Sequence, residues 1–332
     1  MTSSERVHAR LAGAAVDRVP NFTIHMTFAA RRIGKPLAQY YRDYRVLVEA
    51  NRRMVEEFSV DLLQAISDPY REACDLGAEV EFPQESLPIL KRPLLAVPED
   101  LSKLPAVDPA AGPRMGDRLE AVRRMREWSG GAVPVMGWVE GALALAGVLR
   151  GVSTLLVDLV DRPAWVRELL ECAVGLAIRF ARLQVEAGAQ IIGLGDAVAS
   201  QMSPRMYREF ALPYERRIFT AVHSLGALTR LHICGDTTRI LPDMVTAGAD
   251  IIDLDWMVDW KAAHQNFDVA FCGNVDPVAV MLNGTPEEVR EGFLFCLRHG
   301  GPRSFSAAGC EIPLGTPPEN LRAHLETLHT AR

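Results

Sequence analysis

Short runs of apolar residues alternate with longer amphipathic stretches along most of the chain. Seven of these runs are rich in Val, Ile, Leu or Phe, as strands buried on both faces of a parallel sheet should be. An eighth, weaker run near the C-terminus is assigned by its place in the repeat. The runs lie at residues 19–25, 60–67, 133–139, 189–195, 227–234, 249–255, 269–274 and 303–309. Eight strands separated by helices predict an α/β protein with a single (β/α)8 TIM barrel over residues 1–332.

The residues that begin and end helices agree with this repeat. Thr285 is a good N-cap residue, with Pro286 in the first turn and Glu288 completing a capping box. The same order of Thr, Pro and Glu recurs from Thr316. A long apolar stretch that ends at Gly188 predicts another helix. These signals place helices between the predicted strands, as a barrel requires.

The segment from about residue 70 to residue 113 departs from the repeat. It holds seven of the 21 prolines and shows little periodicity. We interpret it as an insertion between strands two and three that lies near the barrel mouth, and not as a second domain.

Composition narrows the class of protein. Of the 332 residues 48% are hydrophobic and 23% charged, which is typical of a globular protein with a large core. The net charge of -6 and the lack of a basic stripe argue against nucleic-acid binding. No window is apolar and uncharged over the roughly 18 to 20 residues of a membrane span, and no signal peptide is visible, so we expect a cytoplasmic protein without a membrane partner. The six scattered cysteines suggest metal binding or catalysis rather than a disulfide framework.

Polar residues follow nearly every predicted strand. In a TIM barrel the carboxyl ends of the strands form the mouth that carries the functional site. Burying such groups costs several kcal/mol each unless they are paired, so their number predicts a site. The residues are His25, Ser67, Asp68, Glu140, Asp196, His232, Cys234, Asp253, Asp255, Asn274, Cys310 and Glu311.

We assign expected roles to most of these residues. Those expected to be catalytic are Glu140, Asp196 and Asp255. Those expected to bind substrate are His25, Asp68, Asn274 and the neighbouring Trp256. Each could instead be a polar residue of the rim that serves only the fold; for His25 a hydrogen-bonded structural role is the commoner one.

His232, Cys234 and Cys310 form the sharpest constellation. His232 and Cys234 are two residues apart on one strand, so their side chains point to the same face. Cys310 follows the last strand, 76 residues after Cys234. One imidazole and two thiolates are suitable ligands for a catalytic Zn²⁺ whose fourth position stays open. The alternative is a histidine packed against two buried cysteines in the core.

Several motifs resemble the methylcobamide:coenzyme M methyltransferases of the uroporphyrinogen decarboxylase superfamily. They are HICGDTTRILPDMVTAGADIIDLDW, GNVDPVAVMLNGTPEEV and AAGCEIPLGTPPENL, with GWVEGALALAGVLRG and MSPRMYREFALPYERRI upstream. The resemblance implies that His232, Cys234 and Cys310 bind zinc. The more distantly similar cobalamin-independent methionine synthases have a glutamate where Asp255 stands, which makes Asp255 a candidate labile fourth ligand. The decarboxylases have an aspartate there without zinc, so Asp255 could equally be a polar residue of the rim. It further implies methyl transfer between a corrinoid on a separate partner protein and a small molecule. The acceptor or donor could be a thiol or a methoxy, amine or halide compound, and a homodimer remains open.

Two other functions compete with methyl transfer. The decarboxylases use N-terminal arginines to hold porphyrinogen carboxylates, but the stretch PNFTIHMTFAARRIG lacks their spacing. Cys310 also stands where the decarboxylases have a histidine, although Asp68 matches their aspartate. The second competitor is a non-catalytic corrinoid or tetrapyrrole carrier. No D-x-H-x-x-G cobalamin-attachment motif is visible, so a corrinoid should arrive on a partner.

Overall fold

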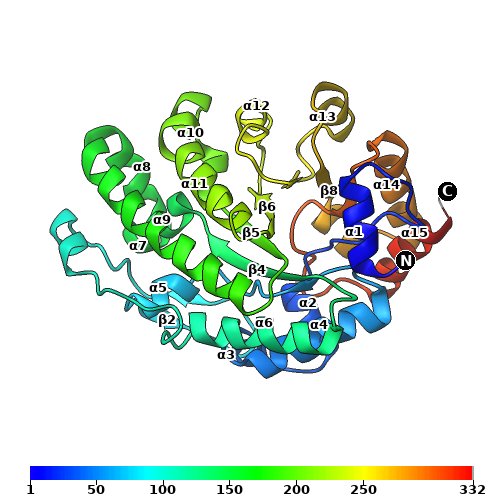
Figure 1. Cartoon of the computed structure of the whole chain (residues 1–332), viewed down its shortest axis with the longest axis horizontal. Helices are drawn as coiled ribbons and strands as arrows, with labels where there is room; N and C mark the ends of the chain where they lie inside the picture. Colours follow the sequence, from blue (N-terminus) through cyan, green and yellow to red (C-terminus); the bar gives the residue numbers. More distant parts are fainter. Residues whose placement is uncertain (331–332) are drawn as a thin grey trace.

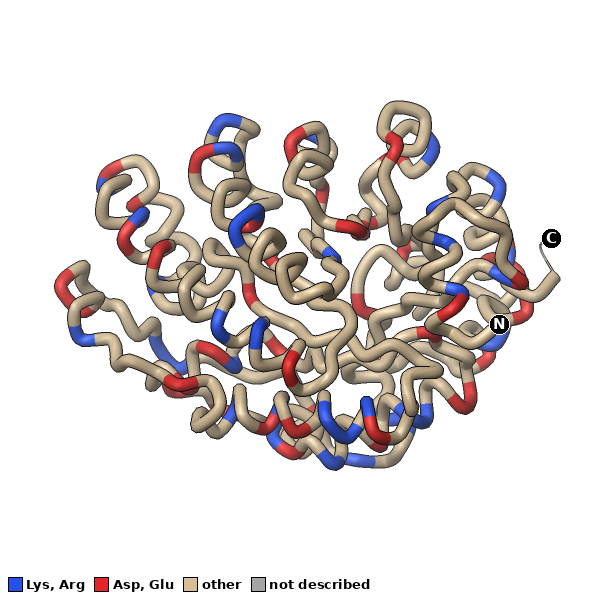
Figure 2. The backbone as a smooth tube through the Cα atoms, in the orientation of Figure 1, with Lys and Arg blue, Asp and Glu red and all other residues tan. Residues whose placement is uncertain are grey.

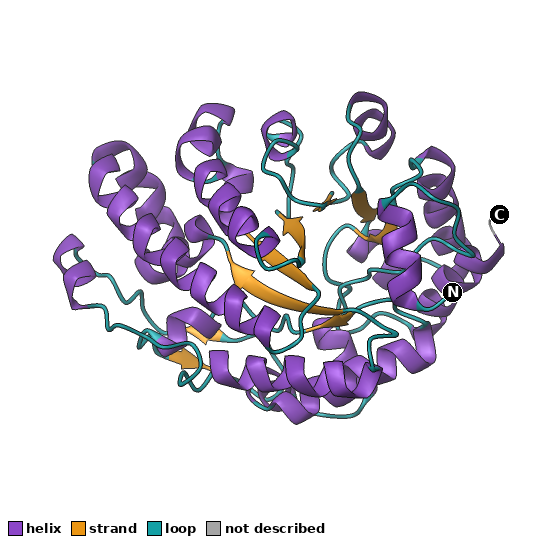
Figure 3. Ribbon diagram, in the orientation of Figure 1, coloured by secondary structure: helices purple, strands orange, loops and turns teal. Residues whose placement is uncertain are grey.

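A curved sheet of seven parallel strands forms the centre of the computed structural model, which describes residues 1–330 (Figure 1). The strands are neighbours in chain order. They are β1 (Leu63–Gln64), β4 (Val135–Glu140), β5 (Ile191–Gly195), β6 (Leu228–His232), β7 (Ile251–Asp253), β8 (Phe271–Val275) and β9 (Phe305–Ala308). Helices surround the strands (Figure 3), and the fold is TIM-barrel-like. Seven of the eight predicted runs therefore contain a strand.

The first predicted strand, residues 19–25, is reduced to a single parallel bridge between Asn21 and Ser306. On that side the Phe22 amide donates to the Ser306 carbonyl at 2.8 Å. On the other side the Asp61 amide donates to the Asn21 carbonyl at 2.8 Å. Pro20 has no N–H for the ladder with β9, although its carbonyl accepts from the Ser306 amide at 2.9 Å. On the side of β1 the Thr23 amide and carbonyl bind the side chains of Asn21 and Gln64, so the ladder ends there. The run thus lies between the last strand and the segment before β1 without forming a regular strand.

Helices follow most strands and cover the convex side of the sheet. The main helices are α1 (Ser3–Leu11), α2 (Met26–Arg32), α3 (Leu37–Arg42), α4 (Tyr44–Phe58), α5 (Arg71–Asp75), α6 (Met115–Ser129), α7 (Ala142–Arg150), α8 (Val152–Asp161), α9 (Pro163–Glu186), α10 (Pro204–Phe210), α11 (Leu212–His223), α12 (Leu241–Met244), α13 (Trp260–Asn266), α14 (Pro286–His299) and α15 (Pro318–Thr330). The predicted capping box is present: Thr285 Oγ1 accepts from the Glu288 amide and Glu288 accepts from the Thr285 amide. Among the described residues no single helix is long and apolar enough to cross a membrane, and only α7 and α8 together, bent by 108°, would pass on length and composition.

The two faces of the sheet have separate cores. The larger core lies between the strands and the surrounding helices. The smaller one fills the concave face, and Val7 of α1 packs into it. Its strand residues include Met136, Trp138, Ile191, Ile251, Cys272 and Phe305. Because side chains alternate along a strand, residues an even number of positions from these also point to the concave face. At the carboxyl ends of the strands such residues form the site.

The segment 70–113 lies between β1 and β4, the predicted strands two and three. It contains α5, the antiparallel pair β2 (Val80–Glu81) and β3 (Ile89–Leu90), and the 3₁₀ helix η1 (Pro98–Lys103). Trp165 Nε1 of α9 donates to the Pro98 carbonyl at 3.0 Å, so part of the segment packs on the outer helices. Its expected position near the mouth stays a prediction. Basic and acidic residues are interspersed over the backbone and form no continuous stripe of one sign (Figure 2).

Candidate metal centre

His232, Cys234 and Cys310 meet at the carboxyl ends of β6 and β9. Their nitrogen and sulfur atoms all lie within 4.8 Å of one another. Cys310 Sγ is 3.7 Å from His232 Nε2. Tetrahedral Zn²⁺ with bonds of 2.0 to 2.3 Å places such atoms roughly 3.5 to 3.8 Å apart. The three donor atoms therefore have the spacing that a shared metal ion needs.

The chemistry of the donors also fits a soft divalent metal. Hydrogen bonds with Cys310 and His232 lower the pKa of Cys234 to about 4. The same bond to Cys234, together with burial, raises the pKa of Cys310. These shifts favour a thiolate on Cys234 and a proton on Cys310, and a divalent ion bound between the two sulfurs would displace that proton. Both cysteines are partly exposed, so an ion can reach them.

A buried carboxylate holds the histidine of the cluster in place. Asp253 Oδ2 is 2.7 Å from His232 Nδ1, which leaves Nε2 to face the two sulfurs. Asp253 Oδ1 in turn accepts a hydrogen bond from Arg230 Nε at 2.8 Å. Asp253 and Arg230 are 3% and 1% exposed, so neither can reorient freely. Asp253 received no role from the sequence, although its position two residues before Asp255 places it on the same inward face.

We predict that Asp253→Asn weakens zinc binding about 10- to 100-fold, because the partner that orients a ligating histidine contributes this much to metal affinity. Competition against a chromophoric chelator measures the change. Asp250→Asn is the matched control, since Asp250 binds His223 and Thr229 at the other end of β7. Equal affinity of Asp253→Asn and the wild type would contradict the assignment.

Asp255 fixes the loops around the cluster. Its Oδ2 accepts from the Gly235 amide at 2.7 Å and its Oδ1 from the Trp256 amide at 2.8 Å. Asn274 Nδ2 donates to the Asp255 carbonyl at 3.2 Å. Trp256 is 49% exposed at the rim. The catalytic or ligating role expected of Asp255, and the substrate contacts expected of Asn274 and Trp256, stay predictions.

Glu140 lies beside the cluster on β4. Its Oε1 accepts from Arg71 Nη2 at 2.7 Å and from Trp138 Nε1 at 3.1 Å. The Trp138 ring is 6.1 Å from the His232 ring, centroid to centroid. The indole therefore contacts the carboxyl group through its nitrogen and approaches the histidine of the candidate metal centre with its ring.

Asp68, expected to bind substrate, is engaged by protein groups. Its Oδ2 accepts from Arg114 Nη2 at 2.6 Å and from Ser67 Oγ at 2.7 Å. Its Oδ1 accepts from the Tyr70 amide at 3.0 Å. Burial would raise the pKa of Asp68, but Arg114 and Arg71 lower it. Sequence reasoning missed both arginines because they lie in or beside the aperiodic segment.

His25 and Asp196 have different surroundings. His25 is 1% exposed, and neither ring nitrogen has a hydrogen-bond partner among residues 1–330. Burial lowers its pKa to about 3, so the ring is neutral. Asp196 Oδ1 accepts from the Ala144 amide at 2.7 Å, at the start of α7. Burial, with Glu215 nearby, raises the pKa of Asp196. A catalytic role for Asp196 stays a prediction.

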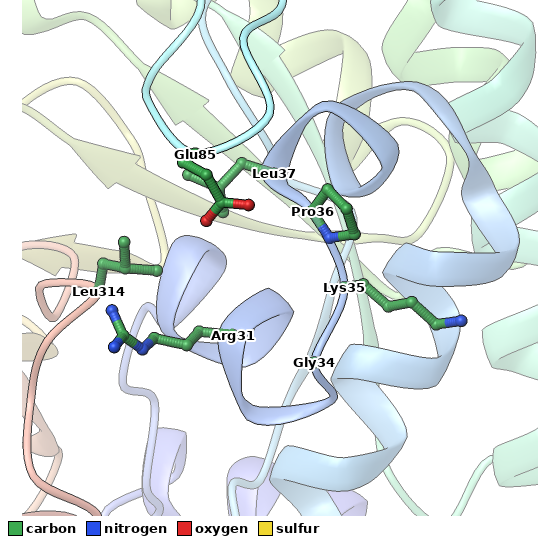
Figure 4. A pocket seen from close by; sticks show the side chains of 7 residues that line it. All are labelled: Arg31, Gly34, Lys35, Pro36, Leu37, Glu85 and Leu314. Carbon is green, nitrogen blue, oxygen red and sulfur yellow. The ribbon is translucent and has the colours of Figure 1, made fainter.

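A cavity of about 330 Å³ lies beside the loop that follows Cys310 (Figure 4). Its walls come from α2, the α2–α3 turn, the aperiodic segment and Leu314. Arg31 and Glu85 extend into the space between these elements (Figure 4). None of the three cluster residues lines this cavity.

The fold and the site define a barrel-like α/β protein with a candidate His/Cys/Cys metal centre. The Uroporphyrinogen decarboxylase (URO-D) family matches residues 2–331, and the chain belongs to this family. It is 30% identical to the methylcobamide:CoM methyltransferase MtbA of Methanosarcina acetivorans, over 98% of this chain and 97% of the relative. It is 28% identical to a uroporphyrinogen decarboxylase of Prochlorococcus marinus, over 98% and 97%. A solved methyltransferase from Methanosarcina mazei shares the fold, with a TM-score of 0.90, 24% identity and 98% of each chain covered.

Proposed function

We propose that the protein is a zinc-dependent methyltransferase that moves a methyl group between a corrinoid and a small molecule. The small molecule is a thiol acceptor or a methylated oxygen, nitrogen or halide donor. The corrinoid arrives on a separate protein, and the reaction takes place in the cytoplasm. The observation that carries the proposal is the convergence of one imidazole and two sulfurs within 4.8 Å, in a family whose members include methylcobamide methyltransferases.

His232, Cys234 and Cys310 would hold the ion. Bound there, Zn²⁺ supplies a Lewis acid that lowers the pKa of a thiol or polarises a methylated heteroatom. The protein's own groups then orient and enclose the substrate. Asp253 fixes the histidine, and Asp255 fixes the loop after Cys234.

The remaining predicted site residues are proposed as substrate contacts or supports. His25 offers two ring nitrogens that have no hydrogen-bond partner within residues 1–330. Trp256 offers an exposed indole at the rim and Asn274 a buried amide. Asp196 supports the start of α7, directly after Glu140 and Gly141. Asp68 binds Arg114 through its side chain and Arg71 through its carbonyl, and Arg71 in turn binds Glu140.

Decarboxylation of a porphyrinogen is the second candidate, because the family includes such enzymes. Its supporting residue is Asp68, which would have to accept hydrogen bonds from pyrrole nitrogens. Both oxygens of Asp68 already accept hydrogen bonds from protein groups, from Arg114 and Ser67 on one and Tyr70 on the other. We therefore favour methyl transfer.

The test combines metal analysis with a corrinoid assay. Purified protein should contain about one zinc per chain and should change the absorbance of free methylcobalamin or cob(I)alamin when a suitable thiol or methylated compound is added. Removing the metal with a chelator should stop the reaction, and zinc should restore it. A zinc-loaded protein that is inert with every donor and acceptor would favour a carrier, and release of CO₂ from uroporphyrinogen would favour decarboxylation.

A further inference from the structure

Glu140 and the candidate metal centre are in register across three strands. Glu140 pairs with Gly195 of β5, and Gly195 pairs with His232 of β6. Residues in register on parallel strands point to the same face, and adjacent strands lie 4.7 to 4.9 Å apart, so the two backbones are about 10 Å apart. The residue between them is a glycine. Glu140 and His232 therefore face the same opening with no intervening side chain from β5.

The indole of Trp138 occupies the floor of this opening. A Cβ atom on Gly195 would lie 2.8 Å from Trp138 Cζ2, so any larger residue there would displace the ring. The ring reaches toward His232 on one side and binds Glu140 Oε1 through Nε1 on the other. Trp138 thereby fixes the orientation of the carboxyl group relative to the cluster.

The second oxygen of Glu140 is available to a ligand. Oε1 is bound by both Arg71 and Trp138, whereas within residues 1–330 no hydrogen bond reaches Oε2. The side chain is 8% exposed, and Oε2 is not among the fully buried unpartnered atoms of the described residues, so this is the oxygen that solvent reaches. A group that enters the mouth meets Glu140 at Oε2.

Charge balance around Glu140 favours a neutral carboxyl group. Arg71 Nη2 lies 2.7 Å from Glu140 and 3.7 Å from Glu72, so two buried acids share one guanidinium. Arg114 cannot compensate, because it pairs with Asp68 at 2.6 Å. Burial, opposed by Arg71 and reinforced by Glu72, raises the pKa of Glu140 to about 8. Two buried acids on one guanidinium favour a shared proton, and Glu140 is the one of the two whose second oxygen is exposed to a ligand.

We propose that Glu140 is the general acid for a methyl donor that leaves through oxygen, so that the substrate class is methoxy compounds. This inference rests on the proposed methyltransfer. The need for an acid distinguishes the donors: an alkoxide or phenolate is a poor leaving group without a proton, whereas a halide or a tertiary amine leaving from a quaternary ammonium needs none. A thiol acceptor has to lose a proton and therefore has no use for an acid at this position.

The cobalt electron pair of a Co(I) corrinoid forms the new bond to the methyl carbon. The carbon–oxygen bond breaks, and its electron pair stays on oxygen, which takes the proton from Glu140 Oε2. The products are an alcohol or phenol, a methyl-Co(III) corrinoid and the Glu140 carboxylate, which Arg71 then stabilises.

The test uses Glu140→Gln, which keeps an oxygen for Arg71 and Trp138 but cannot give up a proton. Demethylation is measured with free cob(I)alamin and a series of methoxyarenes whose phenols differ in pKa. For substrates with basic leaving groups the rate should fall about 10²- to 10⁴-fold, the usual contribution of a general acid. For nitro-substituted methoxyarenes, whose phenolates leave readily, the loss should be much smaller. Zinc content should equal that of the wild type.

Three outcomes would overturn the proposal. An equal loss for all leaving groups would make Glu140 a structural residue. A wild type that methylates thiols from methylcobalamin but demethylates no methoxy compound would leave the methyltransferase function standing and remove the substrate class. A wild type that transfers no methyl group to or from cobalamin would overturn the proposed function itself, and the role of Glu140 with it.

Discussion

Cys310→Ala should purify with little or no zinc while retaining its fold. The sulfur is one of three donor atoms within 4.8 Å, and the partly exposed position allows the remaining two ligands to lose the ion to solvent. Because loss of a supporting residue alone lowers metal affinity 10- to 100-fold, loss of a ligand should lower it by more than about 100-fold. Zinc per chain, measured after dialysis against a weak chelator, reports the effect.

Cys172→Ala is the control for removal of a thiol, since Cys172 is exposed on α9 and outside the cluster. It should keep its zinc. If Cys310→Ala retained one zinc per chain, Cys310 would leave the ligand set and the proposed centre would lose its third donor.

Asp61→Ala should destabilise the protein by about 3–5 kcal/mol, the usual cost of leaving a buried charge uncompensated. Asp61 is 0% exposed and lies between two arginines. Its Oδ1 accepts from Arg6 Nη1 at 2.7 Å, and its Oδ2 accepts from Arg18 Nη1 at 2.6 Å. The Asn21 amide also donates to Oδ2 at 2.7 Å, so the same carboxylate binds the first predicted run, residues 19–25, which forms no regular strand.

Urea denaturation followed by circular dichroism measures this free energy of unfolding. Asp17→Ala is the matched control, because the side chain of Asp17 also binds Arg6 but is 43% exposed. Its effect should be below about 1 kcal/mol, as for other surface ion pairs. Similar effects of the two substitutions would show that Asp61 does not organise this end of the barrel.

The apolar runs were sufficient to predict the order of the strands, because a parallel sheet covered by helices needs runs of this kind. They overestimated the first strand, since apolar content does not reveal that Pro20 lacks a donor or that side chains take the backbone hydrogen bonds of Thr23. The period of two along a strand also decides which polar residues face inward. Glu140, His232 and Asp253 follow it, and Asp253 could have been recognised from it.

The sequence signals for the other features of the site differ in strength. Asp196 follows the inward-facing Gly195 and consequently turns toward α7, which a strict count along the strand would have indicated. Arg71 and Arg114 could not be placed, because they come from helices in and after the aperiodic segment, where neither strand nor helix periodicity sets a direction. The long-range convergence of Cys310 with His232 depends on closure of the sheet, which spacing alone does not supply.

Because only one bridge, between Asn21 and Ser306, joins the first run to the last strand, the candidate metal centre also bears on the stability of the fold. Cys310 lies two residues after β9, the strand that Asn21 joins by this single bridge. His232 ends β6 in the middle of the sheet, and Cys234 follows it. An ion bound by all three residues would cross-link the end of β9 to the end of β6, two strands that are not neighbours in the sheet. Metal binding would then hold the sheet in the curvature that brings the last strand to Asn21. The metal-loaded protein would therefore lose the Asn21–Ser306 bridge less readily than the metal-free one.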